Sequence, residues 1–429
     1  MAEQVEEAAP FGNVKLKVMA YTIPMMGHAL PLVSLCKALA QRGHQVTLAA
    51  SSGLPQLQES CTTAGLKHAP LDDGFTPELL KAQDPMGPVF WDFMNADQKL
   101  FSSLLENESP DVVVSDYVSA APFEICRTKK IPLVLNIPLP GTLVRRMQIL
   151  TYPFVGKILR PAMPATMKNA LIFLTQNVLP VAARTLSIIN SCAAMDGDLQ
   201  LPPNYFFSGP LDGFEKKDLH PEKHADLLDF LSRARAANMP VAYITTGSLT
   251  LLSEQQVLAL YEGFAACNIW VVWSLKKDRQ EFLPKDLPER FYVNSWIPQA
   301  ELMQRPELLC VLTHCGWGGT LECMLAAKPV ICYAGFGDQM ENAKLLNSRG
   351  CGPMLSKPTE SSAKEIQEAV ENVLQHRDSY SAKAAEISEN LRASPGPLVV
   401  AEEIESLVKN GSESVPKPYH LHGPGCQIS

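Results

Sequence analysis

The chain has 429 residues, of which 46% are hydrophobic and 19% are charged, and its formal net charge is −8. A chain of this length exceeds what one compact core accommodates, so we expect an ordinary globular protein with two or more domains. The acidic balance argues against a nucleic acid partner, because a phosphate backbone requires a basic surface.

The 11 cysteines are scattered and form no C-x-x-C pair. Cys310, Cys315, Cys323 and Cys332 lie inside apolar strand and helix patterns, which favours buried free thiols over zinc ligands or disulfides. The N-terminus is acidic and lacks the apolar core of a secretory signal. No stretch approaches the roughly 18–20 apolar residues that span a bilayer. These features together predict a cytoplasmic protein.

The N-terminal region opens with a βαβ pattern that is typical of a doubly wound α/β domain. The pattern predicts a strand, a glycine turn, a helix and a second strand, at 16–23, 24–28, 29–43 and 44–51. Loops at the carboxyl ends of parallel strands border the ligand crevice, so His28 is a catalytic candidate. The alternative for His28 is a capping or packing role. His44, between helix and strand, is expected to be structural.

The next clear strand, 110–116, ends at Asp116, which therefore also lies at the expected crevice. Asp116 either pairs with a catalytic residue or caps the helix predicted at 119–130. The stretch 52–110 is less regular, with a helix predicted at 89–106. Its aromatic residues Phe90 and Trp91 belong either to the core or to an acceptor pocket.

The second half of the chain continues the alternation of strands and helices. The predicted elements are a helix at 224–237, a strand at 240–248, a helix at 253–266, a strand at 268–275 and helices at 362–376 and 380–393. Asp196-Gly-Asp198 matches a D-x-D metal motif formally. It lies in a loop without the neighbouring apolar strand of that motif, so we do not assign it a metal.

A strand, a glycine-rich turn and a helix follow one another from Leu308 to Lys328. The strand is LLCVLTH, the turn is CGWGG, and the helix TLECMLAAK is predicted to carry Glu322 in its first turn. Glycines permit close approach of a ligand, and a helix start presents free N–H groups at its positive end. The stretch therefore predicts an anion site, with phosphate as the usual anion.

Three motifs around this turn resemble the donor-binding signature of the family 1 UDP-glycosyltransferases. They are Trp296-Ile-Pro-Gln299, His314-Cys-Gly-Trp-Gly-Gly-Thr-Leu-Glu322 and Asp338-Gln-Met-Glu-Asn-Ala343. The resemblance extends over about 15–410 and includes Pro24-Met-Met-Gly-His28 near the N-terminus. Two positions depart from the family pattern, since Gly318 replaces an Asn and Gly319 a Ser. The diphosphate contact of that Asn is then expected to pass to backbone N–H groups.

The resemblance implies the GT-B fold, in which two Rossmann-like doubly wound α/β domains face each other across a cleft. The expected parts are an N-terminal tail, an acceptor-binding domain, a charged linker, a UDP-sugar-binding domain, a helix that crosses back and a disordered tail. Their boundaries are 1–14, 15–212, 213–226, 227–395, 396–410 and 411–429.

The resemblance also implies an inverting transfer of a hexose from a UDP-sugar to a hydroxyl of a small lipophilic acceptor. His28 would be the general base, Asp116 would orient it, and the UDP-sugar is a co-substrate rather than a cofactor. No metal is expected. Glucose is favoured because Asp338 and Gln339 suit a neutral hexose. A non-catalytic nucleotide-sugar binder and a transferase using another nucleotide, such as a dTDP-sugar, are the alternatives.

The donor site implied by the resemblance joins several turns. Trp296 would stack on uracil, Gln299 would meet its polar edge, and Glu322 would accept the ribose hydroxyls. Trp317 either contacts the donor or only shapes its turn. The full donor set is Gly247, Ser248, Trp296, Gln299, His314, Gly316, Trp317, Gly318, Gly319, Thr320, Glu322, Asp338 and Gln339. The acceptor-pocket candidates are Phe90, Trp91, Met147 and Tyr152.

The chain ends in Cys426-Gln-Ile-Ser429, which fits a C-a-a-X box loosely. In a eukaryotic source this pattern would allow farnesylation of Cys426 and peripheral membrane attachment. A single prenyl chain without a second signal anchors only marginally. No pattern in the sequence specifies an oligomeric state.

Overall fold

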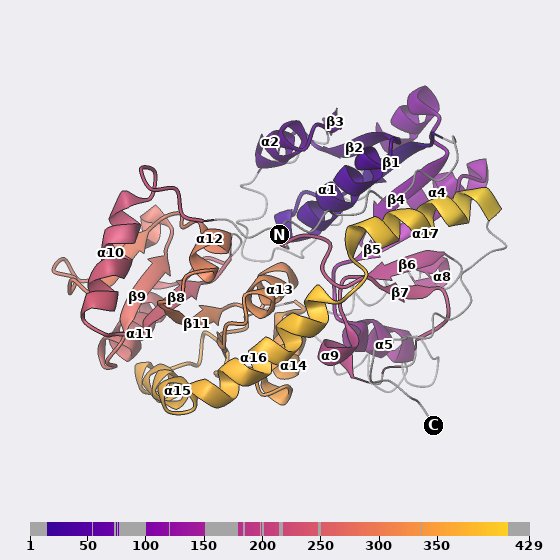
Figure 1. Cartoon of the computed structure of the whole chain (residues 1–429). Coiled ribbons are helices and arrows are strands. Elements are labelled where there is room, and N and C mark those ends of the chain that lie inside the picture. Colours follow the sequence, from indigo (N-terminus) through magenta and orange to yellow (C-terminus); the bar gives the residue numbers. More distant parts are fainter. Residues whose placement is uncertain are drawn as a thin grey trace, which may run out of the picture.

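The computed structural model describes residues 15–53, 55–72, 74, 76, 100–119, 121–150, 179–182, 185–197, 199, 201–213, 218–247, 250–335 and 337–410. Two parallel sheets, each flanked by helices, form two α/β domains (Figure 1). The expected pair of doubly wound domains is therefore confirmed.

Among the described residues, the first sheet has seven strands in the order β3-β2-β1-β4-β5-β6-β7, and all its pairings are parallel. The strands are β1 Lys17–Tyr21, β2 Gln45–Ser51, β3 Lys67–Leu71, β4 Val112–Asp116, β5 Leu133–Ile137, β6 Leu186–Ile189 and β7 Tyr205–Phe207. Because β1 lies between β2 and β4, the strand order reverses there. Ligands bind at the carboxyl ends of the strands at such a reversal.

The second sheet has five parallel strands in the part of the chain that is described, in the order β10-β9-β8-β11-β12. The strands are β8 Val241–Thr245, β9 Trp270–Ser274, β10 Phe291–Asn294, β11 Leu308–Thr313 and β12 Val330–Cys332. The order reverses at β8, which lies between β9 and β11. The turns that follow β8 and β11 are the two glycine-rich turns expected to hold the donor.

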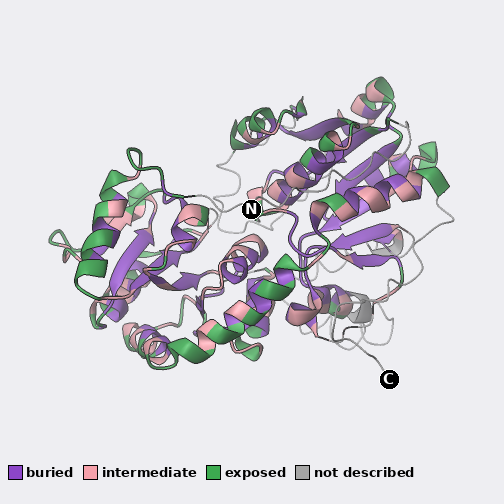
Figure 2. Ribbon diagram, in the orientation of Figure 1, coloured by how far each residue is buried: buried purple, intermediate pink, exposed green. Residues whose placement is uncertain are grey.

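Both faces of each sheet are covered, which explains why the strands have nearly continuous apolar sequences. Along β8, Val241 and Tyr243 belong to the core under one layer of helices, whereas Ala242 and Ile244 belong to the core on the opposite face. Figure 2 shows the strands of both domains as buried, and the exposed residues on the outer surfaces of the helices.

Three helices of the first domain overlap the helices predicted at 29–43, 89–106 and 119–130. The helices of this domain are α1 Met26–Gln41, α2 Pro55–Thr63, a helix at 100–108, α4 Ala121–Lys129, α5 Gly141–Leu150, α8 Leu179–Ala182 and α9 Ala193–Asp196. One boundary differs, because α1 begins at Met26 and includes Gly27 and His28, which were expected in a turn. Glycine costs little at a helix start, where the first N–H groups have no intrahelical partner in any case.

The second half of the chain contributes α10 to α17 and one 3-10 helix to the described residues, and all of these except α17 belong to the second domain. These are α10 Ala225–Ala236, α11 Glu254–Ala265, the 3-10 helix η4 Lys277–Phe282, α12 Gln299–Met303, α13 Trp317–Leu325, α14 Gln339–Ser348, α15 Ala363–Gln375, α16 Arg377–Arg392 and α17 Gly396–Asn410. The prediction for α13 was wrong at its start. This helix begins three residues earlier than expected, at Trp317, so Glu322 lies in its second turn rather than its first.

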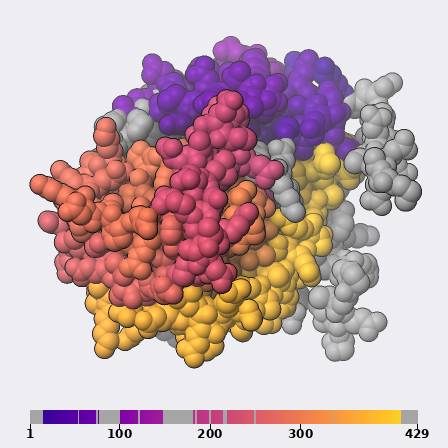
Figure 3. Space-filling view, turned by 60° about the vertical axis from the view of Figure 1, so that its left-hand side comes forward, coloured from indigo at the N-terminus to yellow at the C-terminus, as the bar shows by residue number. Residues whose placement is uncertain are grey.

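The last two helices connect the domains. Ser388 of α16 donates to the carbonyl of Leu325 at the end of α13, at 2.8 Å. Buried residues of α17, among them Val400 and Ile404, belong to the core of the first domain. In Figure 3 the C-terminal residues run along the lower edge of the molecule and reach the N-terminal residues at the right. Helix α17 therefore packs against the first domain, although it follows the second domain in sequence.

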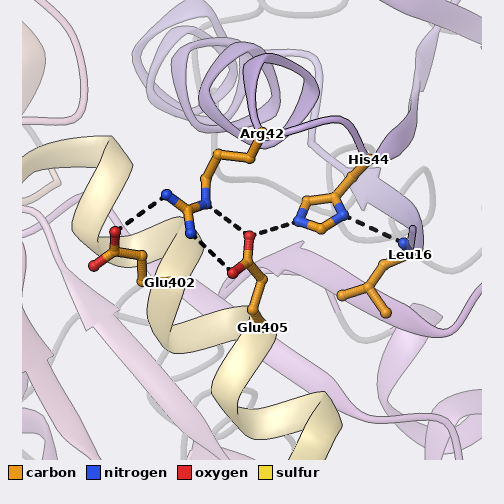
Figure 4. Close-up of polar contacts among 5 residues, drawn as sticks. All are labelled: Leu16, Arg42, His44, Glu402 and Glu405. Carbon is orange, nitrogen blue, oxygen red and sulfur yellow. Dashed lines mark hydrogen bonds and ion pairs between the residues drawn. The ribbon is translucent and has the colours of Figure 1, made fainter. Parts of the chain in front are cut away.

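A polar network fixes α17 to the end of α1 (Figure 4). Arg42 donates to both carboxylate oxygens of Glu405, at 2.7 and 3.0 Å, and to Glu402 at 3.1 Å. His44 accepts the N–H of Leu16 on Nδ1 and donates from Nε2 to Glu405, at 3.2 and 2.7 Å. This arrangement gives His44 the structural position that the sequence predicted.

The ten cysteines within the described residues are free and buried, as expected, and Cys426 lies outside them. A search of the described residues finds no helix that is long and apolar enough to cross a membrane.

Candidate active site

The structure brings together His28 and Asp116, which are 88 residues apart in sequence. Nδ1 of His28 lies 2.7 Å from Oδ2 of Asp116. The second carboxylate oxygen accepts the N–H of Val118 at 2.9 Å, so both ends of the carboxylate are held. His28 comes from the first turn of α1 and Asp116 from the end of β4, on the two sides of the reversal in strand order.

The surroundings of His28 act on its pKa in opposite directions. Burial lowers the pKa of the imidazole, but Asp116 raises it by charge and hydrogen bonding, and Asp338 adds to this, so the pKa lies above its usual value. Asp338 belongs to the second domain, which shows that the two domains face each other here. Burial raises the pKa of Asp338, while a hydrogen bond from Asn342 at 2.7 Å and the charge of His28 oppose that rise.

The start of α13 presents backbone amides at the domain junction. Gly316 precedes the helix, and its carbonyl accepts the first intrahelical hydrogen bond, from the N–H of Thr320 at 2.9 Å. The amides of Trp317, Gly318 and Gly319 are therefore those that a helix start leaves for a ligand. The amide of Thr320 is not among them, because it is already engaged in this intrahelical hydrogen bond.

Two glycines enclose the ring of His314. A Cβ atom added to Gly247 would lie 2.6 Å from this ring, and one added to Gly316 would lie 2.5 Å from it. Gly247 also has a φ of +74°, which only glycine adopts readily. Burial lowers the pKa of His314 to about 4, so the ring is neutral at physiological pH. A neutral ring can donate one N–H group but carries no positive charge.

Gln299 and Glu322, both expected to contact the nucleoside, are hydrogen-bonded to each other. The amide nitrogen of Gln299 donates to Glu322, and its amide oxygen accepts from the hydroxyl of Tyr243 at 3.2 Å. Burial raises the pKa of Glu322 to about 7, although the hydrogen bond from Gln299 opposes this. Trp296 is 67% exposed and offers an open ring face, as a stacking role requires.

Two members of the expected donor set point into the protein. Trp317 is buried, and its indole nitrogen donates to the carbonyl of Asn190 in the first domain at 2.8 Å. The side chain of Thr320 is fully buried. These positions favour the packing alternative for Trp317, whose side chain joins the two domains.

Asp338 and Gln339 stand at the start of α14, in the second domain. Gln339 is buried, and its side-chain oxygen accepts the N–H of Gly335 at 3.0 Å. Arg146 of α5 forms an ion pair with Glu341 in the first turn of the same helix, which links the two domains beside this pair.

Asp196 has a structural partner, as expected when the D-x-D match was set aside. Its carboxylate accepts the N–H groups of Gly141 and Thr142 at the start of α5, both at 2.8 Å. Met147 is buried in the first-domain core. Several predicted positions lie outside the described residues, namely Phe90, Trp91, Tyr152, Asp198, Ser248 and Cys426.

One neighbour of the site was missed from the sequence. The ring of Tyr117 is stacked on that of His28, with centroids 6.1 Å apart and planes inclined by 16°. Its position directly after Asp116 was the only signal in the sequence. The described residues contain no group of three or more His, Cys, Asp or Glu side chains arranged to hold a metal ion.

Comparisons with known proteins agree with this arrangement. Residues 143–396 match the family model described as UDP-glucoronosyl and UDP-glucosyl transferase. UDP-glycosyltransferase 74D1 of Arabidopsis thaliana is 23% identical over 89% of this chain and 93% of its own. The chloroplastic crocetin glucosyltransferase of Gardenia jasminoides is 25% identical over 77% of this chain and 82% of its own. UDP glycosyltransferase 9 of Catharanthus roseus is 33% identical, but the match spans only 25% of this chain and 23% of that relative.

Solved structures show the same fold at lower identity. The glycosyltransferase of kitacinnamycin superposes with a TM-score of 0.70 at 19% identity, over 91% of this chain and 99% of its own. The calicheamicin glycosyltransferase CalG4 superposes with a TM-score of 0.64 at 19% identity, over 92% of this chain and 98% of its own.

Two parallel-sheet domains that face each other, with donor motifs in the second, define a glycosyltransferase of the GT-B fold. The family match covers more than half of the chain, so the protein belongs to the UDP-glucuronosyl and UDP-glucosyl transferase family. It is thus an enzyme that transfers a sugar from a UDP-sugar co-substrate.

Proposed function

We propose that the protein transfers glucose from UDP-glucose to a hydroxyl of a small lipophilic acceptor, with inversion at the anomeric carbon. The observation that carries this proposal is the hydrogen bond of 2.7 Å between His28 and Asp116, on the side of the junction that faces Asp338. An alcohol is a poor nucleophile at neutral pH, so the reaction needs a positioned base.

In the proposed step, Nε2 of His28 accepts the proton of the acceptor hydroxyl while the oxygen attacks the anomeric carbon. The bond from that carbon to the diphosphate oxygen breaks, and UDP leaves with both electrons. Asp116 holds Nδ1 protonated and stabilises the imidazolium that forms. A single displacement from the face opposite the diphosphate converts an α-linked donor into a β-glycoside.

The donor side supports this proposal through groups that match a nucleoside diphosphate sugar. The amides of 317–319 and the neutral ring of His314 offer donors for the leaving diphosphate. Glu322 would turn from Gln299 to the ribose hydroxyls, Gln299 would turn to the polar edge of uracil, and Trp296 offers its exposed ring to the base. These donors stabilise the leaving group without a metal, so we propose a metal-independent reaction.

Glucose and a small acceptor are favoured by the relatives. Crocetin glucosyltransferase and the 7-deoxyloganetic acid glucosyltransferase of Catharanthus roseus are named for transfer of glucose to small molecules. Asp338 and Gln339 at the start of α14 are the proposed partners of the hexose hydroxyls. The first alternative, a binder without catalysis, is disfavoured because His28 and Asp116 are in contact. The second, a transferase for another nucleotide, is tested directly below.

The test is UDP release by the purified protein over a panel of UDP- and dTDP-sugars, with phenols, sterols and other lipophilic alcohols, in the presence of EDTA. We expect acceptor-dependent release with UDP-glucose and a β-linked product by NMR. His28→Ala should abolish transfer and leave UDP-glucose binding nearly intact by calorimetry. His376→Ala, at an exposed histidine between α15 and α16, is the matched control. Near-full turnover in His28→Ala would refute the mechanism.

We also propose a cytoplasmic location, with peripheral membrane attachment only where Cys426 carries a farnesyl group. The intact mass of the protein purified from its native cells shows directly whether Cys426 carries a farnesyl group. An unmodified C-terminus there would remove the membrane part of the proposal.

A further inference from the structure

We infer that Tyr117 is a positioning residue for His28, whose ring face holds the imidazole and stabilises it once it has accepted the acceptor proton. This inference rests on the proposed role of His28 as general base. It adds a third side chain to the pair that the sequence predicted, and it assigns that side chain a contribution that grows as the reaction proceeds.

The geometry places the ring of Tyr117 beside the imidazole in a nearly parallel, offset arrangement. The two rings are nearly parallel, with planes inclined by 16° and centroids 6.1 Å apart. The backbone of Tyr117 is fixed by its N–H, which donates to the carbonyl of Asn136 at 3.0 Å, and its side chain is buried in the first-domain core. Asp116 thus holds one edge of the imidazole by a hydrogen bond, while the ring of Tyr117 lies nearly parallel beside it.

The charges around His28 come from two other elements. Asp116 at the end of β4 and Asp338 at the start of α14 both favour the protonated ring. The facing first turn of α13, Trp317-Gly318-Gly319, carries no ionisable side chain. Tyr117 itself stays neutral, because burial and the two carboxylates raise the pKa of its hydroxyl well above its usual value. It therefore acts on His28 through its π face and not through a charge.

An aromatic ring attracts a cation more strongly than a neutral ring, because the negative quadrupole of its face then meets a net positive charge. The neutral imidazole of the resting enzyme gains little from Tyr117. The imidazolium that develops as the hydroxyl proton is transferred gains the full interaction. An interaction that is stronger in the transition state than in the ground state raises kcat.

The hydroxyl of Tyr117 forms no hydrogen bond with any residue that the structure describes. The inference therefore needs only the ring, and phenylalanine should replace tyrosine in this role. Leucine fills part of the volume but has no π face. The pair Tyr117→Phe and Tyr117→Leu thus separates the aromatic face from the hydroxyl and from simple packing.

The experiment is the pH profile of kcat/KM and kcat for UDP-glucose and an active acceptor, measured for the two variants. A base works only when neutral, so the rate falls as pH falls through the pKa of His28. Since the π face favours the imidazolium, its removal should lower that pKa. In Tyr117→Leu we expect the acid limb to move down by about half a pH unit, or about 0.7 kcal/mol, and the plateau kcat to fall about threefold to tenfold.

Tyr205→Leu is the matched control, since Tyr205 is another buried tyrosine of the same core that does not touch His28. The Tyr205→Leu variant should have a lower melting temperature but an unchanged acid limb of the pH–rate profile. The acid limb of Tyr117→Phe should coincide with that of the wild type. An unchanged limb in a folded Tyr117→Leu variant overturns the inference. If His28→Ala retains turnover, the proposed function itself fails, so the two failures are distinguishable.

Discussion

Gly318 of α13 faces Gly27 of α1 across the domain junction. A Cβ atom at 318 would lie 3.9 Å from the Cα of Gly27, which is an ordinary van der Waals distance. Each of these glycines lies in the first turn of its helix, so the starts of two helices meet next to His28. The side chain that the family carries at 318 would therefore enter this junction.

This contact leads to a prediction for the departure from the family motif. Gly318→Asn should place an amide at the diphosphate and lower the KM for UDP-glucose several-fold, with kcat little changed. Gly318→Ala, as control, should only stabilise the helix, by about 0.5–1 kcal/mol. Steady-state kinetics measures KM and kcat, and calorimetric titration with UDP compares the affinity of each variant with that of the wild type. Equal affinity in Gly318→Asn and wild type would show that the backbone amides already satisfy the diphosphate.

The contact between His28 and Asp116 predicts a strong effect of a nearly isosteric change. Asp116→Asn removes the negative charge that stabilises the imidazolium and disturbs the tautomer of His28. We expect kcat to fall by about a hundredfold or more, with UDP-glucose affinity retained. Steady-state kinetics and calorimetry separate the two quantities. A loss of less than fivefold would argue that Asp116 only caps the following turn through Val118.

The enclosure of His314 predicts opposite outcomes for two glycines of the same turn. Gly316→Ala should displace the ring, because the new Cβ would lie 2.5 Å from its Nε2, and weaken UDP binding by at least about tenfold. A Cβ at Gly319 would be 4.0 Å from the nearest atom, Thr313 Oγ1, so Gly319→Ala should fold and keep the melting temperature. Similar affinities of the two variants for UDP would contradict this account.

Glu322 predicts a pH dependence of donor binding. Burial raises its pKa to about 7, and the ionised carboxylate is the better acceptor for ribose hydroxyls. The affinity for UDP-glucose, whose diphosphate does not titrate near neutrality, should therefore increase as pH rises from 6 to 8. The dependence should disappear in Glu322→Gln. Titration calorimetry across this pH range measures the affinity. An equally steep pH dependence in Glu322→Gln would show that a group other than Glu322 causes it.

The attachment of α17 predicts a stability effect away from the site. Glu405→Gln breaks a buried bidentate pair with Arg42 and should lower the free energy of unfolding by about 3 kcal/mol, measured by urea denaturation. Glu402→Gln, at a more exposed partner of the same arginine, should cost only about 0.5 kcal/mol. Comparable losses in the two variants would show that the burial of Glu405 is not decisive.

The ion pair between Glu405 and Arg42 also predicts how stability changes with pH. Burial alone would raise the pKa of Glu405, but Arg42 and His44 hold it below its ordinary value of 4.5. A depressed folded-state pKa contributes stability above the unfolded value, and that stability is lost as pH falls through the folded value. The difference between wild type and Glu405→Gln should therefore be full above about pH 5 and shrink in more acidic solution.

Much of this protein is determined by local sequence. The apolar runs and glycine turns define β1, β2, β4, β8, β9 and β11 to within two or three residues, because periodicity and turn chemistry act over short distances. The order of strands and helices implies parallel sheets, and the motifs from Trp296 to Gln339 mark the donor side by their spacing. The membership in the glycosyltransferase family needs nothing more.

Tertiary structure decides what depends on distances between separate elements. It brings His28 within 2.7 Å of Asp116, places the ring of Tyr117 nearly parallel to that of His28, and directs the indole N–H of Trp317 to the carbonyl of Asn190. It also partly encloses Glu322 and His314, and desolvation rather than residue type shifts their pKa values. A single sequence carries the identity of these groups but not their desolvation or contacts, which arise only when two sheets and their helices pack together.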